Sequence, residues 1–234
     1  MALYAIGDTH FSEGCDKPMD IFGGAWKGYR DKLVQSFSVL QPEDLLVICG
    51  DFSWGMSLQE ALPDFQLLER FPGKKLLVKG NHDYWWETVS KMKRFFQENQ
   101  IETIDFLHNS CYFYDGAALC GTRGWFYDRN DTNAGDDKIF KRELIRLEAS
   151  LKAAVSQGAA EIECFLHYPP VFQGAEVPQI MEILGRYPVK RVFYGHLHGE
   201  SLRGAFCGVR QGISFHVISA DALSFRPIQI RVYK

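Results

Sequence analysis

The sequence predicts an α/β fold with a largely parallel β-sheet, and three observations support this class. Short, almost uninterrupted apolar runs recur along the chain, which suits strands that are buried on both faces. Between many of these runs, apolar residues recur at spacings of three and four, as they do along one face of a helix. Further strand-like runs follow one another without long helices between them, which points to a second, mixed or antiparallel sheet.

Each predicted strand is an apolar run that ends at a polar residue or shortly before one. Runs that alternate with helical patterns, and so predict the parallel sheet, lie at 3–6, 45–49, 76–78, 164–166 and 191–194. The runs that predict the second sheet lie within 104–121 and 212–233, with examples at 111–114, 117–120, 213–218 and 228–232.

The helices are predicted between these strands. Ser57 and Glu60 have the spacing of a capping box, which predicts that a helix begins there and runs toward Phe71. Other helical patterns lie at 26–40, 84–98, 140–155 and 176–186. No repeat and no long Pro, Gly or Ser linker divides the chain, so we expect a single domain over residues 1–234.

Composition sets limits on the function. The 234 residues are 46% hydrophobic and 24% charged, values that exclude a disordered, collagen-like or coiled-coil protein. The formal charge of −3 argues against long nucleic acid as a partner. The first residues lack the features of a secretion signal, no apolar run is long enough to span a bilayer, and none of the six cysteines forms a CxxC pair. We therefore expect a cytoplasmic protein with reduced thiols and no membrane partner.

The chemistry-bearing residues follow the predicted strands. They form five blocks, which read Asp8-Thr9-His10, Gly50-Asp51, Gly80-Asn81-His82-Asp83, His167 and Gly195-His196-Leu197-His198-Gly199. Functional groups of open α/β sheets gather beyond the carboxyl ends of the strands. Side chains two residues apart in extended backbone point the same way, so each D-x-H or H-x-H pair is expected to face one cavity. The preceding glycines permit sharp turns and close backbone approach.

These side chains are ligands that divalent metals accept. The blocks contain seven candidate ligand side chains, which is more than one tetrahedral zinc can use. Seven ligands suit two metals that share a bridging carboxylate. The candidates are Asp8, His10, Asp51, Asn81, His167, His196 and His198. Two divalent ions, two aspartates and a hydroxide leave a net charge of about +1, which attracts a phosphate anion.

The five blocks resemble the motif series of the calcineurin-like metallophosphoesterases, which is D-x-H, G-D, G-N-H-(D/E), H and G-H-x-H. All five occur here in that order and span about four fifths of the chain, from Asp8 to His198. Individually these motifs are weak, but together and in order they are specific. The resemblance implies a four-layer αββα sandwich, in which two facing mixed β-sheets are flanked by helices.

The resemblance also implies a role for each matching position. It assigns Asp8, His10 and His198 to one metal. It assigns Asn81, His167 and His196 to the second metal. Asp51 is expected to bridge the two. His82 matches the catalytic histidine of the family, which is not a ligand. Asp83 is then expected to orient His82 or a metal ligand. The metals are expected to be two divalent ions, with manganese as the first choice and iron or zinc as alternatives.

The implied reaction is cleavage of a small phosphate ester by a hydroxide that bridges the two metals. A phosphodiesterase or nuclease of the same family, and a protein-binding scaffold without catalysis, are the alternatives. The segment after Gly50-Asp51 lacks the Asp and Arg that protein phosphatases carry there, which weakens a phosphoprotein-phosphatase interpretation. Phe11 also stands where the family often has Gly. Arg123, between two glycines, is the candidate phosphate clamp in place of the missing Arg, with a solvated loop arginine as the alternative.

Two further features leave alternatives open. Aromatic residues close to the motifs form either a rim that stacks on a flat group or packing anchors of the core: Trp54, Tyr84, Trp85, Trp86 and Trp125. Asp221 either supports the cleft or forms a turn. The sequence leaves the substrate and the oligomeric state open.

Overall fold

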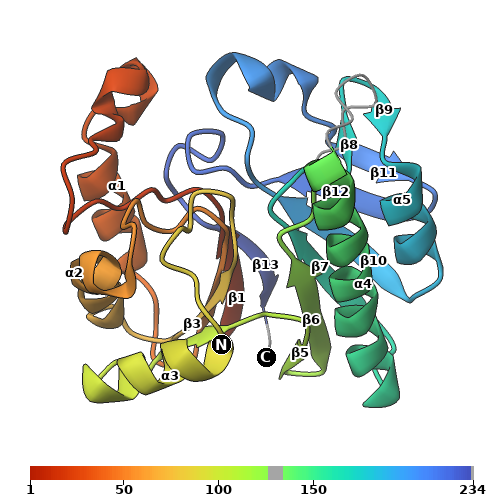
Figure 1. Ribbon diagram of the computed structural model, residues 1–234, viewed down its shortest axis with the longest axis horizontal. Helices are drawn as coiled ribbons and strands as arrows, with labels where there is room; N and C mark the ends of the chain where they lie inside the picture. The colour runs from red at the N-terminus through yellow and green to blue at the C-terminus, as the bar shows by residue number, and fades with distance from the viewer. Residues whose placement is uncertain (126–133, 233–234) are drawn as a thin grey trace.

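The computed structural model describes residues 1–125 and 134–232, which form two facing β-sheets with helices on both outer sides (Figure 1). One outer layer contains α1 (Tyr29–Phe37), α2 (Leu58–Glu69) and α3 (Val89–Glu98). The other contains α4 (Ala134–Ser156) and α5 (Pro178–Gly185). The structure thus confirms the predicted α/β class and the αββα arrangement of layers.

The first sheet has the strand order β13-β1-β2-β3-β4. Its parallel strands are β1 (Ala2–Ile6), β2 (Leu45–Cys49), β3 (Lys74–Val78) and β4 (Ile104–Phe106), and β13 (Ile228–Val232) runs antiparallel to β1. The expectation that 228–232 joins the second sheet is wrong. Ile228 and Ile230 turn toward the apolar layer between the sheets, and the strand pairs with the edge of β1 that would otherwise be open.

The second sheet has the order β11-β12-β10-β7-β6-β5. Its strands are β5 (Cys111–Tyr114), β6 (Ala117–Thr122), β7 (Ile162–Leu166), β10 (Val189–Tyr194), β11 (Gly208–Arg210) and β12 (Ile213–Val217). The four central strands are parallel and both edge strands are antiparallel, so this sheet is mixed. A short hairpin of β8 (Val171–Phe172) and β9 (Ala175–Glu176) lies outside both sheets.

The core has three apolar layers, because each central strand is buried on both faces. All five residues of β2 are buried: Val47 faces the second sheet, and Ile48 faces the helices of the first. Phe165 and Phe193 stack in the layer between the sheets, with ring centroids 5.2 Å apart. This double burial explains why the sequence shows continuous apolar runs rather than alternation.

The helix boundaries follow local signals. Ser57 caps α2, since its Oγ accepts a hydrogen bond from the Glu60 amide at 3.2 Å, as the capping-box spacing predicts. The helical pattern over 26–40 is wrong at its start: α1 begins only at Tyr29, after two short 3-10 helices, η1 (Met19–Phe22) and η2 (Gly24–Trp26). Across the described ranges, no helix combines the length and the apolar character needed to cross a bilayer.

Candidate metal centre

The five sequence blocks meet at one edge of the sandwich, where parallel strands of both sheets end. The first sheet contributes residues that follow β1, β2 and β3: Asp8, His10, Asp51, Asn81 and His82. The second sheet contributes residues that follow β7 and β10: His167, His196 and His198. The predicted site residues thus come together from two different sheets, as the rule for carboxyl strand ends predicts.

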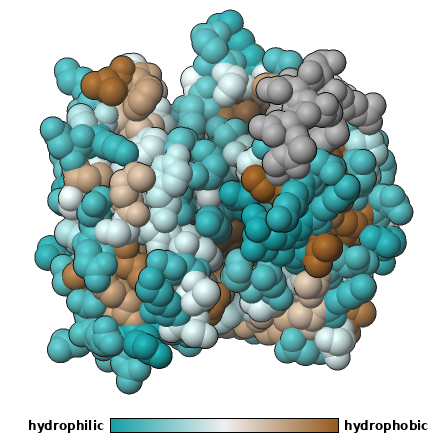
Figure 2. All heavy atoms as spheres, viewed as in Figure 1, coloured by the Kyte–Doolittle hydropathy of each residue, from teal (hydrophilic) through white to brown (hydrophobic). Residues whose placement is uncertain are grey.

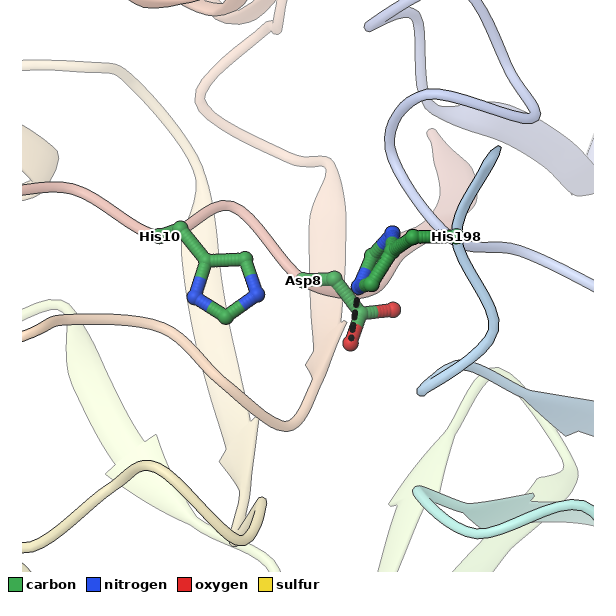
Figure 3. Close-up of side chains that lie close together, drawn as sticks. All are labelled: Asp8, His10 and His198. Carbon is green, nitrogen blue, oxygen red and sulfur yellow. Dashed lines mark ion pairs between the residues drawn. The ribbon is translucent and has the colours of Figure 1, made fainter. Parts of the chain in front are cut away.

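Asp8 lies between two imidazoles at the centre of this group (Figure 3). Ligand atoms of Asp8, His10 and His198 all lie within 4.8 Å of one another. The His198 Nε2 is 3.5 Å from the Asp8 Oδ1. Both Asp8 and His10 are buried, and one carboxylate and two imidazoles are a donor set that divalent metals accept.

A second group shares Asp8 and adds Asp51 and His167, again with ligand atoms within 4.8 Å. The Asp51 Oδ2 lies 3.5 Å from the His167 Nε2 and 3.8 Å from the His10 Nε2. One carboxylate oxygen thus approaches a histidine of each predicted ligand set. That position suits the bridging role that the sequence resemblance implies for Asp51.

The side-chain oxygen of Asn81 lies close to two of the histidines, His167 and His196. Its Oδ1 lies 2.7 Å from the His167 Nε2 and 2.9 Å from the His196 Nδ1. An amide oxygen and two imidazole nitrogens that lie this close together can coordinate the same cation. These three residues are the predicted ligands of the second metal.

The backbone is left-handed rather than extended at both residues of the Asp8 and His10 pair. In the second pair it is left-handed at His196, whereas His198 is extended. The prediction that extended backbone aims each pair at one cavity is therefore wrong. The φ angles are +59° at Asp8, +47° at His10, +50° at Asp51 and +71° at His196. Non-glycine residues rarely adopt this left-handed conformation, which costs energy and clusters at functional sites. Tight turns, rather than strand alternation, aim these side chains at one point.

Two glycines let backbone pass directly beside the carboxylates. A Cβ at Gly80 would lie 2.1 Å from the Asp51 Oδ1, and a Cβ at Gly195 would lie 2.3 Å from the Asp8 Oδ2. Any side chain at these positions would displace a predicted ligand. The expectation that these glycines permit close approach is therefore confirmed at both positions.

The two carboxylates need a cation. Asp8 and Asp51 are 0% and 1% exposed, and the ion pairs found for them in residues 1–125 and 134–232 involve histidines, not Lys or Arg. Burial raises the pKa of Asp51 well above its usual range, and the charge of Asp8 raises it further. Burial also raises the pKa of Asp8, but His198, His167 and His10 together outweigh it, and the net pKa is lowered. Bound divalent ions would neutralise both groups, so the residues fit a metal site.

Three of the four predicted histidine ligands are in the neutral form that binds metals. Burial lowers the pKa of His10 and His167, and burial together with His167 lowers the pKa of His196 to about 3. The Nδ1 of His10 is buried and finds no hydrogen-bond partner in the described part of the chain. Neutral imidazoles with free lone pairs can coordinate a metal without first losing a proton.

Asp221, whose role the sequence left open, supports the cleft. Its Oδ1 lies 2.9 Å from the His198 Nδ1, and its Oδ2 accepts a hydrogen bond from the Gly199 amide at 3.0 Å. Burial lowers the pKa of His198, but Asp8 and Asp221 outweigh it and raise the pKa to about 10. The carboxylate fixes the ring so that Nε2 faces Asp8, as carboxylates commonly do for metal-binding histidines. A single Asp in a loop carries no spacing signal that could have revealed this.

Asp83 is buried and acts on the backbone of a ligand rather than on the imidazole of His82. Its Oδ2 accepts hydrogen bonds from the amides of Asp51 at 3.0 Å and Gly80 at 2.7 Å. Its Oδ1 accepts from the Phe52 amide at 2.9 Å. Burial, followed by the charge of Asp51, raises the pKa of Asp83 to about 7. Of the two roles predicted for it, these contacts match the positioning of a ligand.

A cavity lies over the ligand candidates, and His82 is one of the residues that line it. His82 belongs to neither group of converging ligand atoms found among the described residues. Its amide donates a hydrogen bond to the Asp51 Oδ1 at 2.8 Å. Its ring lies 4.5 Å from the ring of Trp54, measured between centroids. Burial lowers its pKa, and the nearby His167 adds to the effect. His82 thus lies beside the ligand candidates, and its catalytic role stays a prediction.

Arg123 does not line this cavity. Its Nη2 lies 3.4 Å from the Glu143 Oε1, and its guanidinium lies 4.7 Å from the centre of the Trp125 ring. Glu143 is buried and also pairs with Arg146 at 2.6 Å. The role of Arg123 in phosphate binding stays a prediction.

The aromatic residues near the motifs divide between site and core. Trp85 and Trp86 are buried in the layer between the first sheet and its helices. Trp54 stacks on the metal-ligand candidate His10, with centroids 4.8 Å apart, whereas Tyr84 is 53% exposed. No motif or spacing indicated that Trp26, in η2, also lies at the site.

Trp26 contacts two ligand candidates edge-on, at 5.9 Å from His10 and 5.4 Å from His198. On the opposite side, Trp125 packs on Tyr168, whose ring lies 4.2 Å from that of His196. Aromatic rings therefore fix the orientation of three of the histidines from outside.

Comparisons with known proteins agree with this geometry. The family model for calcineurin-like phosphoesterases matches residues 1–200. A search of curated proteins found no significant match. Among solved structures, the chain is similar to AQ665 of Aquifex aeolicus, a protein of unknown function, with 18% identity, a TM-score of 0.52, and coverage of 97% of this chain and 95% of that one.

It is also similar to TT1561 of Thermus thermophilus, with 11% identity, a TM-score of 0.56, and coverage of 99% and 98%. At such low identities these two likenesses show the fold alone. The family match covers most of the chain and includes every predicted ligand. The chain therefore belongs to the calcineurin-like phosphoesterase family, whose members are metal-dependent hydrolases of phosphoesters.

Proposed function

We propose that this protein hydrolyses small phosphate esters at a centre of two divalent metal ions. The observation that carries the proposal is the convergence of Asp8, Asp51 and His167 in one group and Asp8, His10 and His198 in another. Two adjoining groups of ligand atoms, with the Asp51 Oδ2 close to a histidine of each, support a pair of ions rather than one.

Each residue has a defined task in this proposal. Asp8, His10 and His198 would hold one ion, and the oxygen of Asn81 with His167 and His196 would hold the other. Asp51 would serve both ions. When bound, such ions activate water for attack on phosphorus and neutralise charge on the phosphoryl oxygens. Manganese is the first choice for a mixed oxygen and nitrogen ligand set, and iron and zinc are the alternatives.

His82 completes the chemistry. Its imidazole faces the cavity, and its backbone amide is tied to Asp51, so the ring stays beside the ligand cluster. From there it can donate a hydrogen bond or a proton to the oxygen that leaves phosphorus. Asp83 keeps the loop that carries Asp51 in place by accepting hydrogen bonds from four backbone amides, three of them in that loop.

The test compares Asp51→Asn with a matched control. Asp115→Asn makes the same change at an exposed turn residue that also has a positive φ, +44° against +50° at Asp51. After incubation with manganese, iron or zinc, metal content and hydrolysis of p-nitrophenyl phosphate are measured. We expect Asp51→Asn to lose turnover and bound metal, while Asp115→Asn keeps both. An Asp51→Asn protein with full activity and full metal content would contradict the bridging role.

The same assay with bis-p-nitrophenyl phosphate separates the alternatives. Faster hydrolysis of the monoester supports a phosphatase, and faster hydrolysis of the diester supports a phosphodiesterase. A protein that binds metal but hydrolyses neither ester would be a scaffold, and the proposed function would be wrong.

A further inference from the structure

The cavity over the ligand cluster has a mixed lining. Its volume is about 320 Å³. Predicted ligands and His82 line it together with four large apolar side chains: Met19, Phe22, Trp26 and Trp54. This volume lies near the lower end of the range for small-molecule sites, roughly 300–1,000 Å³. A phosphoryl group held by the ligand cluster would therefore bring the organic part of its ester into contact with apolar side chains.

Apolar side chains on the segments around the cavity are also exposed to solvent. In η1, Ile21 is 76% exposed and Phe22 is 64% exposed. Figure 2 shows hydrophobic side chains over the segment drawn in red-orange at the upper left of Figure 1. Met56 and Tyr84, from the loops after β2 and β3, are 51% and 53% exposed. Phe22 is both exposed and part of the cavity lining, so a ligand in the cavity can reach its ring.

Contacts around Lys17 connect these residues to the site. The Lys17 Nζ lies 3.9 Å from the Met56 Sδ and 5.4 Å from the centre of the Trp54 ring. The Trp54 ring in turn packs on His82, and the Tyr84 ring lies 6.1 Å from His82. The Lys17 ammonium thus lies over the Trp54 ring, and Met56 and Tyr84 lie near residues that line the cavity.

We propose that the site is selective for phosphoesters whose organic group carries an aromatic ring, which packs against Phe22 and Trp54 in the cavity. This inference rests on the proposed function and adds the substrate class to it. Ring-on-ring contact favours an aromatic over a saturated ring of the same size by about 3- to 10-fold. The small cavity argues for a small ester rather than a polymer.

The test uses three monoesters with similar leaving alcohols: ethyl, 2-cyclohexylethyl and 2-phenylethyl phosphate. Because the alcohols have similar acidity, differences in kcat/KM report on binding of the organic group. We expect 2-phenylethyl phosphate to exceed the cyclohexyl ester about 3- to 10-fold and ethyl phosphate by more. Equal kcat/KM for the phenyl and ethyl esters would overturn the inference, as would a cyclohexyl ester that is equal or better.

Variants locate the effect. Phe22→Ala is expected to lower the phenylethyl-to-ethyl ratio of kcat/KM about 3- to 10-fold. The matched control is Val209→Ala, which removes an equally exposed apolar side chain (70% exposed) from β11 and should leave the ratio unchanged. A ratio that Phe22→Ala leaves unchanged would overturn the assigned contact.

A binding measurement separates this inference from the proposed function. Calorimetry on the metal-loaded protein compares 2-phenylethylphosphonate with ethylphosphonate, neither of which has an ester bond to cleave. We expect the aromatic phosphonate to bind at least about 3-fold tighter, even if the protein cleaves no ester and the proposed function fails. Equal dissociation constants, or no binding of either phosphonate, would overturn the aromatic preference.

Discussion

Gly80→Ala tests the site geometry with the addition of one methyl group. The Cβ would lie 2.1 Å from the Asp51 Oδ1 and 2.2 Å from the Asp51 backbone nitrogen, whereas real Cβ atoms essentially never come closer than 3.0 Å to such atoms. The loop with Asp51 must therefore retreat by about 0.9 Å. Gly80 does not have a positive φ, so the clash is the main effect of the substitution.

A displacement of this size has two expected costs. A misplacement of about 1 Å in a catalytic group lowers the rate about 10²-fold. Overpacking of a tight interior also lowers the free energy of unfolding by about 1–3 kcal/mol. We therefore expect Gly80→Ala to fold, with a lower melting temperature, a kcat reduced about 10²-fold, and less bound metal.

The assay measures kcat on p-nitrophenyl phosphate, metal content and thermal unfolding on the same preparations. Gly185→Ala is the control, since a Cβ there meets nothing within 4 Å and the residue lies at the end of α5. It should leave kcat and metal content unchanged. If Gly80→Ala keeps wild-type kcat and metal content, Asp51 does not have to stay where the structure places it, and the close approach of Gly80 has no functional role.

Three further predictions concern single side chains. The His82→Ala variant should keep its metal but lose about 10²–10⁴ in kcat, as expected for loss of a proton donor. His108→Ala is the control. Loss of metal in the His82→Ala variant would show that His82 is a ligand instead. Asp221→Asn should weaken metal binding about 10- to 100-fold, because His198 loses its charged partner; unchanged affinity in a metal titration would reject that role. Burial lowers the pKa of Lys75 from 10.5 to about 8, so the unfolded chain binds its proton more tightly. The free energy of unfolding should thus rise between about pH 8 and 10.5, and urea titrations of Lys75→Met should show a smaller rise; an equal rise would contradict the assignment.

The strands could be predicted because burial on both faces leaves a direct mark on the sequence. Runs such as 45–49 and 164–166 appear as strands within a residue or two. What the runs could not predict is which sheet each strand joins. The runs at 164–166 and 191–194 lie in the second sheet, and 228–232 lies in the first, because pairing depends on contacts between distant segments.

The sequence could predict the site residues that belong to motifs. It could not predict residues that reach the site from elsewhere in the chain. The predicted ligands all lie at the cleft, since they follow strands in a fixed order. Asp221 and Trp26 reach His198 from distant loops, and no local spacing reveals such contacts. The left-handed backbone conformation of Asp51 could not be predicted either, because the residue types next to it do not require that conformation.

The origin of the ligands in two separate sheets has a consequence for stability. Asp51 follows a strand of one sheet and His167 a strand of the other, so ions coordinated by both would join the two halves of the sandwich. Through thermodynamic linkage, a ligand at 1,000 times its dissociation constant adds about 4 kcal/mol to the free energy of unfolding. Chelation should therefore loosen the whole sandwich as well as stop turnover, and metal supply would govern how long the folded protein persists.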